Sequence, residues 1–248
     1  MKTQIELLAP AKDIEIGMAA IRHGADAVYI GGESFGARFA ASNSFSEIEK
    51  LANYAHQFHA KVYLTLNTLL YDEEVLPAQK MAFDAYNAGV DALIIQDFGL
   101  MEVGLPPIPI HASTQMHNFT PERIKFLQSA GFSRVVLPRE MTIDTIRKIH
   151  ETTYIDLEYF IHGALCVSYS GQCYMSASNG GRSANRGSCA QPCRLPYNIL
   201  DKNKQIIAEQ KHVLSLKDLN LENQLDKLIE AGVSSLKIEG RLKSMPYV

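Results

Sequence analysis

The sequence is poor in the features that mark secreted and membrane proteins. Its 248 residues include no tryptophan and only four cysteines, which excludes a scaffold held together by many disulfides. No run of about 18 apolar residues occurs, and no apolar signal segment precedes the first strand-like residues. The formal net charge is only −3, so no global charge imbalance points to nucleic acid or a membrane. We therefore expect a cytoplasmic protein with no membrane partner.

The sequence does contain a repeating unit. Four times, a glycine at the end of a helical pattern is followed within about three residues by a short apolar run. Glycine suits the left-handed conformation that follows a helix end. The runs are apolar on both faces, which is typical of strands covered by helices and by a barrel interior. The four glycines are Gly24, Gly89, Gly131 and Gly232.

Eight strands are predicted to alternate with helices. Such alternation indicates a parallel sheet, and eight is the number of strands that closes a barrel. The alternative is a doubly wound open sheet, but no Gly-x-Gly-x-x-Gly follows the first strand. We therefore predict an α/β fold with one TIM-type (β/α)8 barrel domain over residues 1–248. The predicted strands are 5–10, 27–31, 62–67, 92–96, 109–112, 134–138, 156–162 and 235–240.

Three helix boundaries are also predicted. Ser46 with Glu49 has the spacing of a capping box, and Thr120 followed by Pro121 is typical of a helix start. The last residues, 241–248, resemble the first turn of a closing helix. The barrel is therefore expected to lack its final helix within this sequence.

A long insertion, 164–212, follows strand seven and contains every cysteine of the chain, with the spacing C-x6-C-x15-C-x3-C. Its glycines and serines allow tight turns, so four thiolates can converge on one centre. A reducing compartment disfavours disulfides. A 4Fe–4S cluster accepts such loose spacing, whereas structural zinc prefers tight pairs and only the second pair is tight. Buried free cysteines remain the third possibility.

Polar residues collect at the predicted carboxyl ends of the strands, where TIM barrels carry their active sites. They suit a polar substrate, although each residue alone also fits a solvated strand end or a helix cap. His162 is the most suggestive, because it closes strand seven four residues before Cys166. The candidate catalytic residues are His162, Glu140, Glu239 and Arg241, and the candidate substrate-binding residues are Arg38, Asn67, Gln96, Asp97, Gln115, Arg139 and Lys237.

Arginines and tyrosines are interleaved in the insertion. Aromatic rings beside arginines stack nucleobases and hold phosphates, so a basic rim is one interpretation; ordinary loop composition is the other. The rim would contain Arg38, Arg139, Arg182, Arg186, Arg194, Arg241 and Lys243, and the tyrosines are Tyr169, Tyr174 and Tyr197.

A longer motif runs across strand seven into the insertion. The segment Glu158-x-Phe160-x-x-Gly163-Ala164-Leu165-Cys166-x4-Gly171-x-Cys173-x-Met175-Ser176 resembles the signature of peptidase family U32, the collagenase-like proteases. Leu8-Ala9-Pro10-Ala11, Phe35-Gly36-Ala37-Arg38 and the stretch from Lys237 to Ser244 are similar to the family as well. The resemblance covers the whole chain. Because family members are generally longer, it implies that residues 1–248 are the N-terminal barrel of a longer protein.

This resemblance implies two different activities. The family name implies peptide hydrolysis, whereas several members are RNA-hydroxylation proteins that act on a tRNA uridine or an rRNA cytidine. In those members four cysteines hold a 4Fe–4S cluster, and the matching positions here are Cys166, Cys173, Cys189 and Cys193. A small-molecule co-substrate is compatible with this chemistry.

The His-Glu-x-x-His motif of zinc peptidases is absent from the sequence. A thiol protease built on His162 and Cys166 would leave three cysteines unexplained. We therefore favour an iron–sulfur enzyme of RNA base hydroxylation. The alternatives are a collagenase-like peptidase acting on peptides and a zinc-stabilised binding module.

Overall fold

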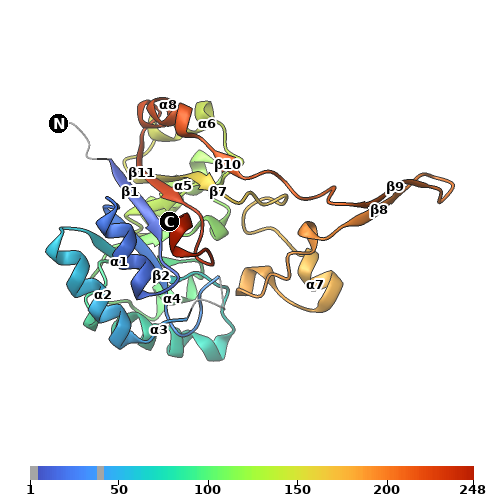
Figure 1. Ribbon diagram of the computed structural model, residues 1–248. Helices are drawn as coiled ribbons and strands as arrows, with labels where there is room; N and C mark the ends of the chain where they lie inside the picture. The colour runs from blue at the N-terminus through green and yellow to red at the C-terminus, as the bar shows by residue number, and fades with distance from the viewer. Residues whose placement is uncertain (1–4, 38–41) are drawn as a thin grey trace.

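The computed structural model describes residues 5–37 and 42–248 as a closed barrel. Eight parallel strands follow the order β1-β2-β3-β4-β5-β6-β7-β11, and β11 pairs with β1 to close the ring (Figure 1). The predicted barrel is confirmed, and every predicted strand end lies within two residues of the observed one. The strands are β1 (Glu6–Pro10), β2 (Ala27–Gly31), β3 (Lys61–Leu66), β4 (Ala92–Ile95), β5 (Ile110–Ala112), β6 (Arg134–Val136), β7 (Asp156–Gly163) and β11 (Val233–Ile238).

Helices cover the outside of the barrel. They pack apolar residues such as Ile48 and Leu51 against the outward faces of the strands. Thr120 caps α5 as predicted, with its side chain accepting from Arg123 N. The helices are α1 (Ile14–Arg22), α2 (Phe45–Gln57), α3 (Asp72–Asn87), α4 (Gly99–Glu102), α5 (Pro121–Ser129), α6 (Ile143–His150), α7 (Met175–Gly180) and α8 (Leu225–Glu230).

One predicted helix start is wrong. The capping box of α2 is Ser44 with Glu47, not Ser46 with Glu49. Both pairs have the same spacing, and the earlier start brings Phe45 into the helix, where it packs against the core. Residues 241–248, which resemble the first turn of a closing helix, form one short 3-10 turn, η5 (Met245–Tyr247), and no full helix. Across the described residues, no helix is both long and apolar enough to span a membrane.

The barrel interior combines a small apolar group with buried charge. Strand alternation places Tyr29 inside the barrel and its neighbours Val28 and Ile30 outside. The apolar interior residues are Leu8, Ala27, Tyr29, Tyr63, Ala92 and Ile94. Beside them lie Glu158 and Lys237, both buried. The prediction of runs apolar on both faces is therefore wrong at Lys237.

The chain makes one long excursion from the barrel. It leaves at Gly163 and returns at β10 (Leu219–Asn220), which pairs antiparallel with the end of β7. The predicted insertion 164–212 is not structureless. We call residues 164–196 the cysteine loop; it contains α7 and the 3-10 turns η2 (Ala184–Arg186) and η3 (Pro192–Arg194). Residues 197–211 form the hairpin of β8 (Tyr197–Leu200) and β9 (Ile206–Lys211), which projects away from the barrel (Figure 1).

Candidate functional site

A small polar cavity occupies the carboxyl end of the barrel. Asn67, just after β3, accepts a hydrogen bond from Ala37 N at 2.9 Å and donates to Ser113 Oγ at 3.2 Å. Arg241 Nη1 donates to Thr65 Oγ1 at 2.7 Å. The cavity thus offers amide and hydroxyl groups held in fixed positions. Its lining includes Tyr29, Thr65, Asn67, Ser113, Thr114, Gln115, Arg139, Phe160, Lys237, Glu239 and Arg241.

Arg139 stands at the edge of this cavity. Its guanidinium forms an ion pair with Glu239 and lies 3.7 Å from the centre of the Phe160 ring. Its Nε is buried and has no hydrogen-bond partner among the described residues. The side chain is therefore fixed on two sides, and its Nε–H remains for a ligand.

A chain of charged side chains runs along the barrel axis beneath the cavity. Lys237 Nζ lies 2.6 Å from Glu158 Oε1, and Arg134 Nη1 lies 3.4 Å from Glu158 Oε2. Arg134 also pairs with Glu6, which accepts from Ser235 Oγ at 2.8 Å. Each buried charge thus has an opposite charge beside it, which is how such groups are tolerated in an interior.

The pKa values of these groups reflect both burial and pairing. Burial is the largest single effect and would raise the pKa of Glu6. The Arg134 guanidinium, together with hydrogen bonds from Tyr63 and Ser235, outweighs burial and lowers the pKa below the usual value. Burial lowers the pKa of Lys237, against the opposing effect of the Glu158 carboxylate. Lys237 also lines the polar cavity, so it presents a desolvated amine or ammonium group there.

The cysteine loop is fastened to the barrel by several contacts. Glu140, after β6, accepts from Ser170 N at 2.9 Å and from Ser170 Oγ at 3.2 Å. Arg186 forms a two-point ion pair with Glu74 of α3, at 2.7 and 2.8 Å. These contacts join the loop to two sides of the barrel mouth.

Two glycines lie where the loop touches the barrel backbone. At Gly171, φ is +74° and an added Cβ would lie 2.0 Å from Gln115 O; at Gly187, φ is +81° and the distance to Gly36 O would be 2.5 Å. A side chain at either position would push the loop off the barrel. The contact between the loop and the barrel therefore requires glycine at these two positions.

All four cysteines line one cavity of about 110 Å³ inside the cysteine loop, and none is in a disulfide. Cys189 Sγ accepts from Gln191 N at 3.4 Å and lies 3.9 Å from Ser176 Oγ. Burial raises the pKa of Cys193, and the sulfur of Cys166 adds to this effect. Within the described part of the chain, no group of three or more His, Cys, Asp or Glu is arranged to hold a metal ion. We call this cavity the cysteine pocket.

The cysteine pocket and the polar cavity are neighbours. Thr114, Gln115 and Arg139 line both. A third hollow, of about 500 Å³, meets the pocket from the other side and shares Arg139, Cys166, Cys189 and Cys193 with it. The barrel mouth and the cysteine site therefore form one continuous surface.

The structure gathers only some of the predicted site residues. Those around the polar cavity are Asn67, Gln115, Arg139, Lys237, Glu239 and Arg241. Asp97 instead accepts from Leu70 N and Gly99 N, both at 2.8 Å, and orders the chain after β4. Gln96 is buried, donating to Gln115 O at 3.3 Å. Arg38 lies outside the described residues.

The predicted catalytic residues Glu140 and His162 also lie outside the cavity lining. Glu140 holds Ser170, as described above, and the His162 ring packs 5.8 Å from the Tyr247 ring. No hydrogen bond in the described chain joins His162 to Cys166. Thr65 and the Glu158 network were not predicted from the sequence. Glu158 shares its strand face with Phe160, so an inward charge at that register was a usable signal.

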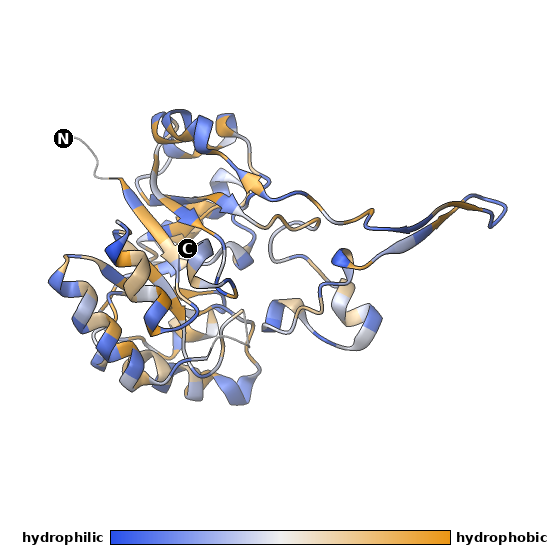
Figure 2. Ribbon diagram, viewed as in Figure 1, coloured by the Kyte–Doolittle hydropathy of each residue, from blue (hydrophilic) through white to orange (hydrophobic). Residues whose placement is uncertain are grey.

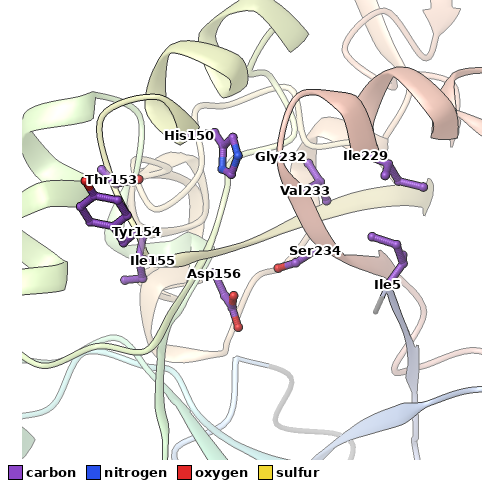
Figure 3. Close-up of a pocket in the computed structure, with 10 residues that line it drawn as sticks. All are labelled: Ile5, His150, Thr153, Tyr154, Ile155, Asp156, Ile229, Gly232, Val233 and Ser234. Atoms are coloured by element: carbon purple, nitrogen blue, oxygen red, sulfur yellow. The ribbon is translucent and has the colours of Figure 1, made fainter. Parts of the chain in front are cut away.

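A larger hollow, of about 610 Å³, lies at the opposite, amino-terminal end of the barrel. Figure 3 shows its walls, which come from the segment between α6 and β7, the start of β11 and the end of α8. Tyr154 stands on its rim and is 99% exposed. Active sites of TIM barrels lie at the other end, and the cysteines and the polar cavity are there too.

Three relatives with named functions are similar to this chain over nearly its whole length. The chain is 54% identical over 245 residues to the 23S rRNA 5-hydroxycytidine C2501 synthase of Escherichia coli, covering 99% of this chain and 38% of that protein. It is 37% identical over 262 residues to a collagenase of Porphyromonas gingivalis (98% and 62%). It is also 37% identical over 253 residues to tRNA hydroxylation protein P1 of Bacillus subtilis (98% and 60%). The chain thus spans less than two thirds of each of these relatives.

The fold and the family agree with these similarities. The solved structure of the U32 peptidase Mk0906 matches with a TM-score of 0.61 at 13% identity, over 97% of this chain and 95% of that chain. The model of peptidase family U32 matches residues 12–248. This chain belongs to peptidase family U32.

Proposed function

We propose that this chain is the catalytic barrel of an RNA base hydroxylase that uses an iron–sulfur cluster. The observation that carries the proposal is the cysteine pocket, which brings four thiols together beside the polar cavity of the barrel mouth. The relatives named for rRNA and tRNA hydroxylation support RNA as the substrate.

The donor set of the cysteine pocket fits a 4Fe–4S cluster. Its described lining contains four cysteines and no His, Asp or Glu, and thiolates are the ligands that such clusters require. The holding residues would be Cys166, Cys173, Cys189 and Cys193. A bound cluster supplies electron transfer. The Gln191 amide already donates to Cys189 Sγ, a contact of the kind that tunes cluster potentials.

The chain's own residues would position the substrate. The fixed amide of Asn67 and hydroxyl of Ser113, with the amide of Gln115 beside them, suit the polar edge of a nucleobase. Arg139 offers its free Nε at the border between the polar cavity and the cysteine pocket. Lys237, paired with Glu158, places its amino group at the floor of the polar cavity. Together these groups disfavour an apolar substrate and orient one that forms hydrogen bonds.

The cofactor part of the proposal is tested by anaerobic purification of the full chain, with iron, sulfide and zinc analysis. We expect a brown protein with iron and sulfide in equal amounts, lost on Cys173→Ser and kept in the control Ser178→Ala, whose exposed hydroxyl bonds only Met175 O in the described chain. One zinc per chain would instead favour a zinc-stabilised module. Colourless, metal-free protein would contradict both.

The substrate part is tested in cells that lack the endogenous hydroxylase, by mass spectrometry of rRNA and tRNA nucleosides. Restoring a hydroxylated pyrimidine with the full-length protein, but not with its Cys173→Ser variant, is the expected result. Unmodified RNA together with hydrolysis of gelatin would favour a peptidase.

A further inference from the structure

We propose that the surface over the cysteine pocket seats one unpaired RNA nucleotide, with its base stacked on Tyr169 and its phosphate bound by Arg182. The choice of RNA rests on the proposed function. The seat itself is argued from the ring contacts, the charges and the two hollows that meet at the cysteines.

Tyr169 is an exposed ring that is nevertheless held in place. It lines the cysteine pocket and is 61% exposed. Its edge packs against the rings of His117 and Phe119, with centroids 6.1 Å away in both cases, and those two rings stack on each other at 5.9 Å and 8°. A supported ring loses little conformational freedom when a base stacks on it, so it is a good platform for unpaired bases.

The other tyrosines of the predicted rim lack this arrangement. Tyr174 is 66% exposed, but it does not line the pocket and has no ring contact among the described residues. The hydroxyl of Tyr197 donates to Pro192 O at 2.8 Å, so that ring braces the loop. Of the three, only Tyr169 combines exposure, support and proximity to the cysteines.

The charge around the cysteines suits a phosphate. The hollow of about 500 Å³ beyond the cysteine pocket is lined by Arg139, Arg182 and Arg194, and no Asp or Glu is among its described lining residues. Arg139 is paired with Glu239, and Arg194 donates to Leu216 O at 2.7 Å. Phosphates are preferred ligands of such arginine clusters.

Arg182 has the most freedom of the three arginines. It is exposed, and in the described chain its one hydrogen bond runs from Nε to Ser188 O at 3.0 Å. That bond fixes the side chain while leaving both terminal nitrogens for a ligand. Cys166, Cys189 and Cys193 line both hollows, so a nucleotide with its phosphate at Arg182 and its base at Tyr169 would cross the cysteines.

The test is fluorescence anisotropy of a labelled single-stranded oligoribonucleotide with the full chain, prepared without oxygen. Losing one stacked base weakens binding by about 5- to 150-fold, which is the effect expected for Tyr169→Ala. Tyr169→Phe should keep binding within about twofold, because the ring face remains. The control Tyr154→Ala, at the opposite end of the barrel (Figure 3), should change nothing.

For Arg182→Gln we expect weaker binding to every sequence and a salt dependence whose slope falls by about 1, as for one lost phosphate contact. The control is Arg22→Gln on the outer end of α1. If wild-type protein binds the oligonucleotide while Tyr169→Ala and Arg182→Gln bind it as well as their controls do, that result would contradict the nucleotide site at Tyr169 and Arg182 but leave RNA as the proposed substrate. If Tyr169→Phe fails as badly as Tyr169→Ala, stacking is wrong. If wild-type protein binds no RNA, the proposed function fails with the seat.

Discussion

The barrel and the excursion after β7 are built by different means. Every residue of β2 is buried, and the charges inside the barrel neutralise one another. In the hairpin, by contrast, all residues of β9 but one are exposed, and Figure 2 shows apolar and polar residues side by side along it. The barrel is therefore stabilised by its own packing. The excursion depends on a few contacts with the barrel.

The largest effect on stability is expected from removing one charge from the barrel interior. Lys237→Met leaves Glu158 short of its partner at 2.6 Å. Removing one member of a buried pair costs about 3–5 kcal/mol, so we expect a loss of that order in the free energy of unfolding, measured in urea. In the double variant Lys237→Met with Glu158→Leu most of the loss should be recovered. A single variant as stable as wild type would show that Arg134, 3.4 Å from Glu158, is enough to neutralise the carboxylate.

The next largest effect is expected where the cysteine loop contacts the barrel backbone. Gly171→Ala places a Cβ against Gln115 O at a positive φ, and we expect about 1–3 kcal/mol of strain. The loop should lift from the barrel, so proteolysis within residues 164–196 should speed up while the barrel stays folded. Gly181→Ala is the matched control, because φ there is +66° but nothing lies within 4 Å. Equal cleavage of the two variants would contradict the docking contact.

A smaller effect is expected from the ion pair between Arg186 and Glu74. Arg186→Gln should cost less than about 1 kcal/mol, since the pair is partly exposed. The hydrogen bond from Arg186 lowers the pKa of Glu74 below its usual 4.5. The pair is therefore intact above pH 4.5 and is lost as the pH falls through the lowered folded pKa.

Protection of the wild-type loop from an acid-active protease should fall in that pH range, whereas Arg186→Gln should show no such step. Arg147→Gln, which removes a pair with Asp144 on α6 instead, should keep the wild-type profile. A step that persists in Arg186→Gln would assign it to another group.

The smallest effect should come from the hairpin. Ile206→Thr and Ile207→Thr replace exposed side chains, so each should change the free energy of unfolding by no more than about 0.5 kcal/mol. Urea unfolding of both variants checks this. A loss above about 1 kcal/mol would mean that the hairpin packs against the rest of the molecule in solution.

The barrel was predictable because its pattern is local. Apolar runs after Gly24 and Gly89 fix strand positions, and the sequence around Thr120 fixes a helix start. The grouping of the cysteines around one pocket was predictable too, because all four lie in one insertion. Their cofactor stays a prediction.

Other parts of the site depend on contacts that spacing does not reveal. Asp97 and Glu140 stand at strand ends like true cavity residues, yet they order neighbouring backbone instead. The choice between Ser44 and Ser46 as a helix cap was decided by the packing of Phe45. The hairpin has no buried face and so left no periodic pattern to read.

The pairing of β10 with the end of β7 has a consequence for how this molecule can vary. Gly163, where the chain departs, is the register partner of Leu219, where it comes back. The two ends of the excursion therefore lie side by side, and its length does not affect how the barrel closes. The barrel tolerates segments inserted or deleted between these ends, because closing a longer loop costs little. The sequence of the excursion can thus change without changing the barrel, although both belong to one polypeptide.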